Sequence, residues 1–579
     1  MKAAPFDYVR PATVTQAVAA LSEAGDDAKV LAGGQSLVPV LAMRLGRPTL
    51  LVDINTVAGL DELSLSEDTL YVGATVRQRR LEYDPLTAAV PLLGMALPWI
   101  GHRELRSRGT VCGSLAHADP AAELPAVAAC LDATLDIAGP SGRRTVSARD
   151  FFAAPMTTVL APDELLLAAH FPVAGPQDGF AFAELSRRHG DYALTGVAVR
   201  VTHTASGELH KAVLAAFAIS SRPVVIDITA HLTAALSDAG SGEPADALVR
   251  ALTPPMSALA DELVDTPGDM HASNAYRRRL FTHLAARELA HAHQRAKADP
   301  VREPTGVRSS PGGSRTSSAA RTSSARTPSA PARTCPANQS AVTEMKVNGK
   351  QVTIEAPPRM TLADALRDRL GLKGTHLGCE HGICGMCTVL IDGQAARSCL
   401  LFACQLDGAE VLTVEGLGRP GELHPLQQAF GRHHALQCGF CTPGFLLSAY
   451  DLLRHQPEVT QDELATELSG VLCRCTGYRN ILSAVGEVAR THRDGLPAPL
   501  NCADTALRHC RRGHGRRTHR RGRVRGCRRG DRGGWAGGGR RGGGRRCGGR
   551  GGRGDGRRRA RGHRCRRDRR SGHRRGRAW

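Results

Sequence analysis

Short apolar runs and amphipathic segments alternate along the first 300 residues of the chain. Three apolar runs are bounded by turn residues and predict strands, namely KVLAGG, TLLVDI and DTLYVGATV. The segment TVTQAVAALSEA has apolar residues at helical spacing, with Thr13 or Thr15 as its cap, and YRRRLFTHLAARELAHAH predicts a closing helix. Residues 1 to about 292 are therefore predicted to form α/β structure.

A second folded unit is predicted from about Met345 to Arg493. Its first half predicts a strand hairpin in MKVNGKQVTIEAPP, a capped helix in TLADALRDRLG that ends at Gly371, and strands in CTVLIDG and EVLTVEG. Its second half predicts helices in LHPLQQAFGRHH, TPGFLLSAYDLLRHQ, TQDELATELSG and NILSAVGEVAR. The whole chain is thus predicted to be an α+β multidomain protein.

Composition separates these units. Residues from about 297 to 341 are rich in Ser, Pro, Thr and Arg and contain too few aliphatic side chains to build a core, which predicts a flexible linker. As a coil, a linker of about 45 residues would span roughly 35–40 Å. After Leu507 the chain contains no Leu, Ile, Met, Phe or Tyr, so a disordered tail is predicted there.

The tail also carries the excess charge. Residues 501–579 contain 30 Arg, 4 Asp and no Lys, a charge of +26, so the whole-chain value of +21 leaves −5 on residues 1–500. One interpretation is an RGG-like nucleic-acid arm, but stacking aromatics are limited to Trp535 and Trp579. The other, which we favour, is a frameshift product of GC-rich coding DNA or a non-functional extension.

Length and hydropathy narrow the class of protein. A chain of 579 residues predicts two to four domains. It has no run of about 20 apolar residues and its N-terminus lacks an apolar export core, so no membrane span and a cytoplasmic location are predicted. In a reducing compartment, clustered cysteines favour metal or redox chemistry over disulfides.

The first cysteine set has the spacing C-x4-C-x2-C-x11-C and consists of Cys379, Cys384, Cys387 and Cys399. This is the plant-type ferredoxin spacing for a [2Fe–2S] cluster. Gly378, Gly382 and Gly385 let the loop turn sharply and bring N–H groups close to the sulfurs. The alternative is a zinc site, but zinc ribbons have two well-separated C-x2-C knuckles.

The second cysteine set has the spacing C-x2-C-x31-C-x-C and consists of Cys438, Cys441, Cys473 and Cys475. By spacing alone it fits either zinc or an iron–sulfur cluster. Both pairs lie at the starts of predicted helices, whose macrodipoles favour a negatively charged group. Thr442 and Thr476 are predicted to cap these helices.

With both sets in place, residues 345–493 resemble the iron–sulfur subunit of the molybdenum hydroxylases, the xanthine dehydrogenase and aerobic carbon monoxide dehydrogenase family. The resemblance implies a β-grasp ferredoxin domain and a four-helix domain, each with a [2Fe–2S] cluster on one cysteine set. It also implies that Gln437 and Cys438 lie nearest a molybdopterin held by a separate subunit or domain. The spare Cys404 is predicted to be a buried small hydrophobe.

Two segments of the N-terminal unit carry further chemistry, LAGGQSLVPVLAMRL from Leu31 and RGTVCGSLAHADPAAELP from Arg108. In the first, a strand runs into Gly33 and Gly34 and a helix opens near Ser36, which offers backbone N–H groups to a phosphate. Gly-Gly turns are common, so this loop is not specific by itself.

Together these segments resemble the flavin subunit of the same family over residues 1 to about 290. The resemblance implies one FAD loop that holds the pyrophosphate, made of Ala32, Gly33, Gly34, Gln35 and Ser36. It implies a second loop made of Thr110, Val111, Cys112, Gly113 and Ser114, although Cys112 stands where many relatives have Gly. Asp119 is expected toward the ribose or the ring, and Asp191 and Tyr192 near the flavin ring. A structural role for His117 and a capping role for Asp119 before Pro120 stay open.

The predicted organisation follows from these assignments: a PCMH-type FAD-binding domain (1–175), a flavoprotein C-terminal domain (176–293), a linker (294–343), a ferredoxin domain (344–420), a four-helix [2Fe–2S] domain (421–495) and the tail (496–579). In the family's multidomain enzymes the iron–sulfur unit precedes the flavin unit, so the order here is reversed. The linker is expected to let the two units dock.

The resemblance implies an electron-transfer component of an oxidoreductase. Electrons would pass from molybdopterin on a large partner subunit, which binds the small-molecule substrate, through the second and first clusters to FAD and an external acceptor. No nucleic acid partner and a dimer of heteromers are expected. Two alternatives are a self-contained NAD(P)H reductase and a nucleic-acid-binding protein that acts through its tail. Substrate and final acceptor are not encoded in these residues.

Overall fold

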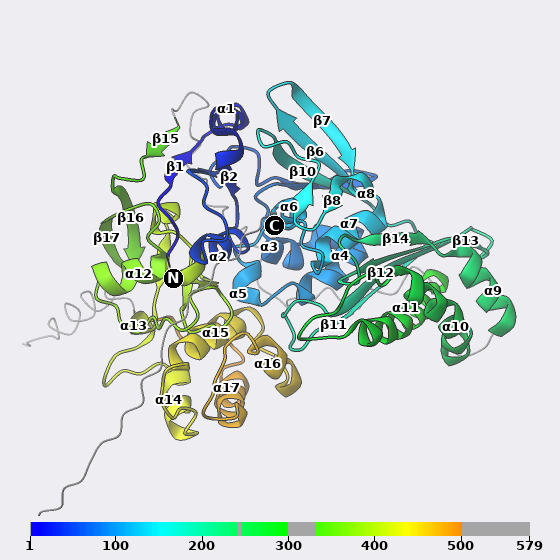
Figure 1. Cartoon of the computed structure of the whole chain (residues 1–579). Helices are drawn as coiled ribbons and strands as arrows, with labels where there is room; N and C mark the ends of the chain where they lie inside the picture. Colours follow the sequence, from blue (N-terminus) through cyan, green and yellow to red (C-terminus); the bar gives the residue numbers. More distant parts are fainter. Residues whose placement is uncertain (1, 240–244, 299–331, 501–579) are drawn as a thin grey trace, which may run out of the picture. The chain divides into compact units, whose positions relative to one another are not determined.

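The computed structural model describes residues 2–239, 245–298 and 332–500 (Figure 1). Most of the predicted linker and the arginine-rich tail from residue 501 onward lie outside the described residues. Within the described ranges, no helix has both the length and the apolar character that a membrane crossing requires.

Two sheets form the N-terminal region, residues 2–172. The smaller has the order β15, β1 (Asp7–Arg10), β3 (Leu50–Asp53) and β2 (Ala28–Leu31), of which the last three run parallel, whereas β15 (Arg333–Cys335) joins from later in the chain. The larger is antiparallel, with the order β4 (Leu63–Leu65), β5 (Thr69–Gly73), β10 (Leu165–Pro172), β6 (Thr134–Gly139) and β7 (Gly142–Ser147). Apolar side chains from both sheets share one core.

The helices of this region are α1 (Val14–Ala24), α2 (Leu37–Ala42), α3 (Gln78–Tyr83), α4 (Pro91–Ala96), α5 (Arg103–Arg106), α6 (Val111–His117), α7 (Glu123–Leu131) and α8 (Ala148–Phe151), followed by the small hairpin β8 (Phe152–Ala154) and β9 (Thr157–Thr158). Of the two predicted caps, Thr13 begins α1, because its side chain accepts the N–H of Gln16. All residues of α7 are buried, so this helix belongs to the core.

The middle region is an antiparallel sheet with helices against it. Its strands follow chain order, β11 (Asp178–Leu185), β12 (Thr195–His203), β13 (Leu209–Phe217) and β14 (Val224–Asp227). Helices α9 (Thr229–Ala239) and α11 (Asn274–Lys297) pack on it, and α10 (Ala245–Leu263) packs against these two helices (Figure 1). Gly179 permits the contact between β11 and α11, since a Cβ there would lie 2.0 Å from the carbonyl oxygen of Ala292.

Both ends of the segment predicted as a linker, 294–343, are regular structure. Helix α11 continues to Lys297, and β15 (Arg333–Cys335) pairs antiparallel with β1 before β16 begins at Ala341. The edge of β1 offers free backbone groups, and the three-residue β15 satisfies them although its sequence has no strand signal. Residues 496–500, predicted as the start of the tail, are also described.

A mixed β-grasp sheet follows, with the order β17 (Lys350–Ala356), β16 (Ala341–Val347), β20 (Glu410–Leu412), β18 (Thr388–Ile391) and β19 (Gln394–Arg397). The predicted hairpin turns at Asn348 and Gly349, both with positive φ. The segment predicted as one capped helix begins at Thr361 as expected, but only α12 (Leu362–Asp364) is α-helical and a π-helical turn covers Ala365–Arg369.

The last described region is helical, as predicted. It comprises α13 (Val414–Leu417), α14 (Pro425–Arg432), α15 (Thr442–His455), α16 (Gln461–Glu467) and α17 (Arg479–Thr491), which enclose one apolar core. Thr460 and Glu463 form a capping box at the start of α16. Of these helices, α15 begins directly after Cys441 and α17 begins shortly after Cys475, so both start near cysteines of the second set.

Candidate functional site

The four cysteines of the first set converge in two pairs. The backbone N–H of Cys379 donates to Sγ of Cys384 at 3.4 Å, and the N–H of Cys384 donates to Sγ of Cys379 at 3.4 Å. Cys387 and Cys399 also contact each other through their side chains. Cys384, Cys387 and Cys399 are buried and Cys379 is half-buried. This pairing suits a diiron core, in which each iron takes two of the four thiolates.

The glycines of this loop are required for two different reasons. Gly382 and Gly385 have φ of 93° and 79°, in the left-handed region that favours glycine. Gly378 is needed for space, because a Cβ there would lie 2.9 Å from Sδ of Met386 and 3.0 Å from Sγ of Cys384. The backbone therefore approaches the sulfurs more closely than a chain with side chains could.

The second cysteine set also forms two pairs. Sγ of Cys475 lies 3.5 Å from Sγ of Cys438, and the side chains of Cys441 and Cys473 are in contact. Cys438 and Cys475 are exposed, whereas Cys441 is buried. Among the described residues, no group of three or more His, Cys, Asp or Glu side chains could hold a single metal ion. In both sets the four thiols therefore lie in two pairs.

The predicted helix caps at the second set are wrong. Cys441 occupies the cap position of α15, and the buried hydroxyl of Thr442 has no hydrogen-bond partner among the described residues. Helix α17 begins after Tyr478, in the left-handed conformation, rather than after Thr476. Thr476 instead stabilises the thiol of Cys473, because the backbone N–H of Thr476 donates to Sγ of Cys473 at 3.4 Å.

The two cysteine sets are joined through the backbone. The N–H of Leu472, the residue before Cys473, donates to the carbonyl oxygen of Cys384 at 2.9 Å. Next to this bond, a Cβ on Gly444 would lie 2.5 Å from the carbonyl oxygen of Gly385. The ligand loops of the two sets are therefore in direct contact.

The two loops predicted to hold FAD lie side by side. A Cβ on Gly33 would lie 2.3 Å from the carbonyl oxygen of Arg108, so only glycine allows this approach. Thr110 caps α6 by accepting the N–H of Gly113 at 3.0 Å. A Cβ on Gly113 would lie 4.0 Å from Cβ of Ala32, and one pocket is lined by Ala32, Cys112 and Gly113.

The two loops, Ala32–Ser36 and Thr110–Ser114, form a cradle that contains one buried polar side-chain atom without a hydrogen-bond partner in the described part of the chain. Oε1 of Gln35 is buried and has no hydrogen-bond partner among the described residues, while its amide nitrogen donates to the carbonyl oxygen of Gly33 at 2.7 Å. Buried acceptors are normally paired. A cofactor that carries hydroxyl donors would pair this oxygen, so the cradle fits FAD.

Two residues that the sequence did not single out connect these loops. Arg77 donates to the carbonyl oxygen of Arg108 and to Oδ1 of Asn55, both at 2.6 Å. Asn55 in turn donates to the carbonyl oxygen of Ala32 at 2.8 Å. Asn55 and Arg77 thus hold the two loops at a fixed spacing. They lie in separate segments with no motif, so the sequence carries no local signal for them.

The remaining predicted flavin residues lie beyond the loops. Asp119 accepts the N–H of Ala121 at 2.9 Å, a local turn before α7 rather than a helix cap. Asp191 pairs with Arg188 at 2.7 Å, and the ring of Tyr192 is 66 % exposed. His117, in the last turn of α6, is half-buried, and burial lowers its pKa.

Two buried acids lie near these residues and were also missed. Glu123 begins α7 and Glu184 lies on β11, and they are 7 % and 5 % exposed. Neither oxygen of Glu184 has a hydrogen-bond partner among the described residues. Burial, and then the neighbouring Glu123, raise the pKa of Glu184 to about 9. Glu184 is therefore a neutral carboxylic acid at neutral pH.

We expect this acid to make stability fall with pH. The folded chain keeps the Glu184 proton up to a pKa of about 9, whereas the unfolded chain loses it above the ordinary value of 4.5. The contribution of Glu184 to the free energy of unfolding is therefore highest below pH 4.5 and decreases as the pH rises from 4.5 toward about 9, by at most about 1.4 kcal/mol per pH unit. Urea midpoints measured across this range should fall less steeply for Glu184→Gln than for the parent.

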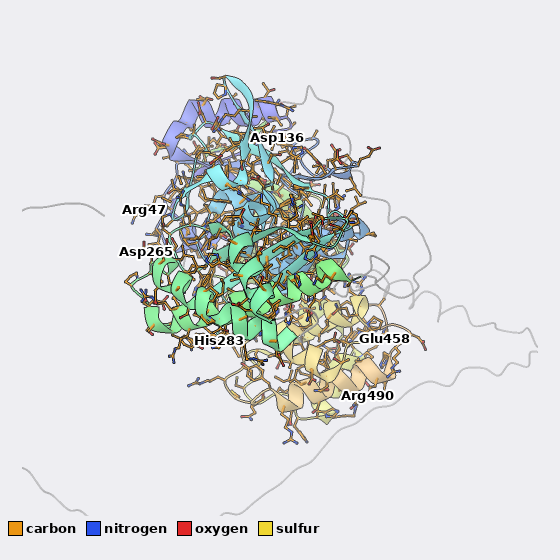
Figure 2. The ribbon with its side chains drawn as sticks, turned by 90° about the vertical axis from the view of Figure 1, so that its right-hand side faces the viewer. Arg47, Asp136, Asp265, His283, Glu458 and Arg490 are labelled. Atoms are coloured by element: carbon orange, nitrogen blue, oxygen red, sulfur yellow. The ribbon has the colours of Figure 1, made fainter. Side chains whose placement is uncertain are left out.

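The exposed Glu458 provides the control for this measurement (Figure 2). Replacing Glu458 by glutamine should leave the pH slope unchanged, because water already solvates its charge. An identical slope in the parent and in Glu184→Gln would contradict the raised pKa.

The flavin cradle and the first cysteine set meet across a shared core. A Cβ on Gly34 would lie 3.5 Å from the carbonyl oxygen of Leu400, the residue after Cys399. Leu31 and Phe402 belong to one apolar cluster, which also contains Cys404. Cys404 is 8 % exposed, so its prediction as a buried small hydrophobe is confirmed.

Comparison with known families assigns these regions. Family models match at residues 4–174 (FAD binding domain in molybdopterin dehydrogenase), 180–292 (CO dehydrogenase flavoprotein C-terminal domain), 345–413 (2Fe-2S iron-sulfur cluster binding domain) and 413–486 ([2Fe-2S] binding domain). Together they cover more than half of the chain. The chain belongs to the molybdenum hydroxylase family. Both cysteine sets fall within [2Fe–2S] domains, which favours iron–sulfur clusters over zinc.

Relatives of this molybdenum hydroxylase component are separate subunits in Paenarthrobacter nicotinovorans. Subunit alpha of the 6-hydroxypseudooxynicotine dehydrogenase complex is 37 % identical over 306 residues, 52 % of this chain and 99 % of the relative. Subunit beta is 48 % identical over 154 residues, 26 % of this chain and 96 % of the relative. The nicotine 6-hydroxylase small subunit is 56 % identical over 142 residues, 24 % of this chain and 86 % of the relative.

The family assignment confirms the predicted class and cofactors. This molybdenum hydroxylase component combines the flavin and iron–sulfur parts in one chain and is an electron-transfer oxidoreductase with FAD and two [2Fe–2S] clusters. Its two dehydrogenase relatives are subunits of one complex, the 6-hydroxypseudooxynicotine dehydrogenase complex.

Proposed function

We propose that this chain carries electrons from a molybdenum–pterin site on a partner subunit to an external acceptor. The route runs through a cluster on the second cysteine set, then a cluster on the first set, and then FAD in the cradle of Ala32–Ser36 and Thr110–Ser114. The clusters supply one-electron carriers and FAD a two-electron carrier. The chain's own residues set the order of these groups.

The exposed end of this route suits a partner. Cys438, Cys475 and the neighbouring Gln437 are exposed. Leu436 and Phe440 flank them, and each is 43 % exposed. Apolar side chains around an exposed redox site favour a protein contact that excludes water. We therefore place the molybdenum-binding subunit at this face.

The observation that carries the proposal is the bond between Leu472 N–H and the Cys384 carbonyl at 2.9 Å. Because Cys438 and Cys475 are exposed, this contact supports an order in which the second set lies between the exposed face and the first set. The contact of Gly34 with Leu400 then supports a first set next to the flavin loop. The eight thiolates hold the iron, and the cradle holds the FAD phosphates.

Other features of the assembly stay predictions. We infer a dimer of heteromers, a cytoplasmic location and no nucleic acid partner from the resemblance to the family. The tail on which the nucleic-acid alternative depends lies outside the described residues.

Replacing Cys438 by alanine tests the route. The variant should lose about half of its iron and the electron paramagnetic resonance (EPR) signal of one cluster, because one of the two [2Fe–2S] domains loses a ligand. In complex with the large subunit, flavin reduction by substrate should fall to background, while direct reduction by dithionite persists. Cys335, on β15 and outside both sets, gives the matched control Cys335→Ala. Full iron content in Cys438→Ala would contradict the ligation.

A further inference from the structure

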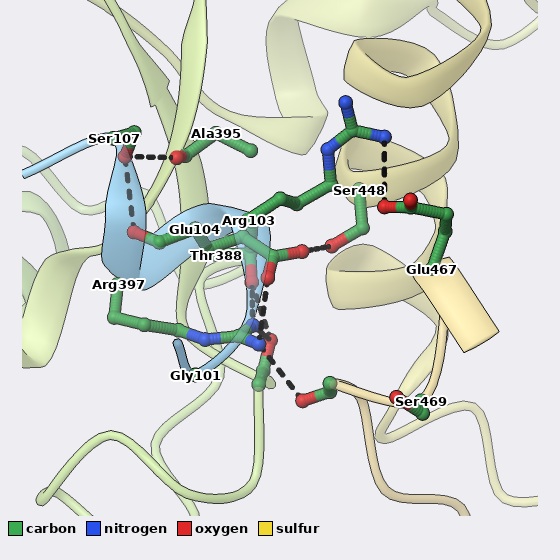
Figure 3. Close-up of polar contacts among 12 residues, drawn as sticks. Gly101, Arg103, Glu104, Ser107, Thr388, Ala395, Arg397, Ser448, Glu467 and Ser469 are labelled. Carbon is green, nitrogen blue, oxygen red and sulfur yellow. Dashed lines mark hydrogen bonds and ion pairs between the residues drawn. The ribbon is translucent and has the colours of Figure 1, made fainter. Parts of the chain in front are cut away.

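One guanidinium group touches three separate parts of the molecule. Arg397, the last residue of β19, has a fully buried side chain. Its Nη1 donates to the carbonyl oxygen of Gly385 at 3.0 Å, and its Nη2 donates to the carbonyl oxygen of Gly470 at 2.8 Å. The same Nη2 donates to Oε2 of Glu104 at 3.1 Å (Figure 3). A further bond from Nη1 reaches the hydroxyl of Thr388.

Three of these acceptors belong to different parts of the proposed electron-transfer route. Gly385 lies inside the ligand loop of the first cysteine set. Gly470 begins the loop that leads into the second pair of the second set. Glu104 lies on α5 of the flavin-binding region. Arg397 is therefore bonded at once to the loops of both cysteine sets and to the flavin region.

The charge of Arg397 on β19 is balanced by the carboxylate of Glu104 on α5 of the flavin-binding region. Glu104 is 1 % exposed at its side chain, and Oγ of Ser448 on α15 donates to its other oxygen at 2.5 Å (Figure 3). Burial would raise the pKa of Glu104, but Arg397, with His102 and the Ser448 hydrogen bond, lowers it to about 2. The pair is thus ionised and buried, and loss of either partner leaves an uncompensated charge.

The surrounding backbone leaves no room for another arrangement. A Cβ on Gly385 would lie 2.5 Å from the carbonyl oxygen of Gly470 and 2.7 Å from Nη1 of Arg397. On Gly470, a Cβ would lie 2.8 Å from Nη2 of the same arginine. The two loops are therefore separated only by backbone atoms and one planar guanidinium group.

We infer that Arg397, paired with Glu104, is a positioning residue that fixes both clusters and the flavin region in one geometry for electron transfer. The inference rests on the proposed ligation by the two cysteine sets. Lysine cannot replace the arginine, because only the planar guanidinium donates from two nitrogens to acceptors on opposite sides.

The test compares the full chain with Arg397→Lys, Arg397→Met and the control Arg278→Lys. Arg278 forms an exposed pair with Asp261 at 3.1 Å, so its replacement should change nothing. In each protein we would measure iron, sulfide and FAD content, the magnetic interaction between the two reduced clusters by EPR, and the rate at which reduced clusters pass electrons to the flavin. Both Arg397 variants should keep a cluster signal yet lose the parent's magnetic splitting and transfer electrons more slowly.

A double variant distinguishes a loss of geometry from a failure of the single variants to fold. Glu104→Gln with Arg397→Met removes both buried charges and should restore folding and cofactor content, but not the splitting. Cluster signals with the parent's splitting and transfer rate in Arg397→Lys and in the double variant would overturn the inference. Absence of both cluster signals from the parent would instead overturn the proposed ligation, so the two failures are distinguishable.

Discussion

Replacing Asp451 by asparagine is expected to lower the free energy of unfolding by about 3–5 kcal/mol. The carboxylate of Asp451 on α15 is fully buried and lies 2.6 Å from Nη1 of Arg79 and 3.3 Å from Nε of Arg103. Both arginines belong to the flavin-binding region and are 2 % and 1 % exposed at their side chains. Without the carboxylate, the buried Arg79 loses this ion pair, and Arg103 is left with the longer pair to Glu467 at 3.6 Å.

Urea midpoints followed by flavin fluorescence would measure this loss. Asp261→Asn is the matched control, because Asp261 pairs with Arg278 at the surface with side chains 70 % and 40 % exposed. Its free energy of unfolding, derived from the urea midpoint, should stay within about 0.5 kcal/mol of the parent's value. A parent-like midpoint for Asp451→Asn would show that the interface does not depend on this ion pair.

This ion pair also shows why part of the site could not be predicted. Arg79 and Asp451 are 372 positions apart, and neither lies in a motif. A single charged residue usually indicates a solvated surface, and only the tertiary structure reveals that these charges are buried against each other. The same holds for Asn55 and Arg77, whose partners come from other elements, and for Glu184, whose burial only the tertiary structure reveals.

The cysteine sets were predictable for the opposite reason. Their cysteines lie in short loops, and the chemistry of a diiron core dictates thiolate spacing and glycine placement within such a loop. The two flavin loops were instead predicted from the resemblance to the family, and their binding of FAD stays a prediction. Local reasoning failed at Thr442, because Cys441 takes the cap position one residue earlier. It also missed β15, whose pairing is determined by the free edge of β1.

Gly385 gives the largest expected effect on a cofactor. Replacing Gly385 by alanine should abolish the first cluster, because the new Cβ would lie 2.5 Å from the carbonyl oxygen of Gly470 and 2.7 Å from Nη1 of Arg397. Neither neighbour can move freely, since one is backbone and the other is a buried, paired guanidinium group. Iron content should fall by about half, and the EPR signal of one cluster should disappear.

Gly371 separates this clash from backbone strain. Its φ of 71° resembles the 79° of Gly385, but a Cβ on Gly371 meets no atom within 4 Å. Alanine at Gly371 should therefore cost only about 1 kcal/mol from the left-handed backbone and leave both clusters intact. Equal cluster loss in the two variants would assign the effect to φ alone, whereas loss confined to Gly385→Ala would locate it at the contact between the two ligand loops. The second result would mean that the loop of the first cluster depends for its shape on the loop of the second, so that the relay assembles as one unit.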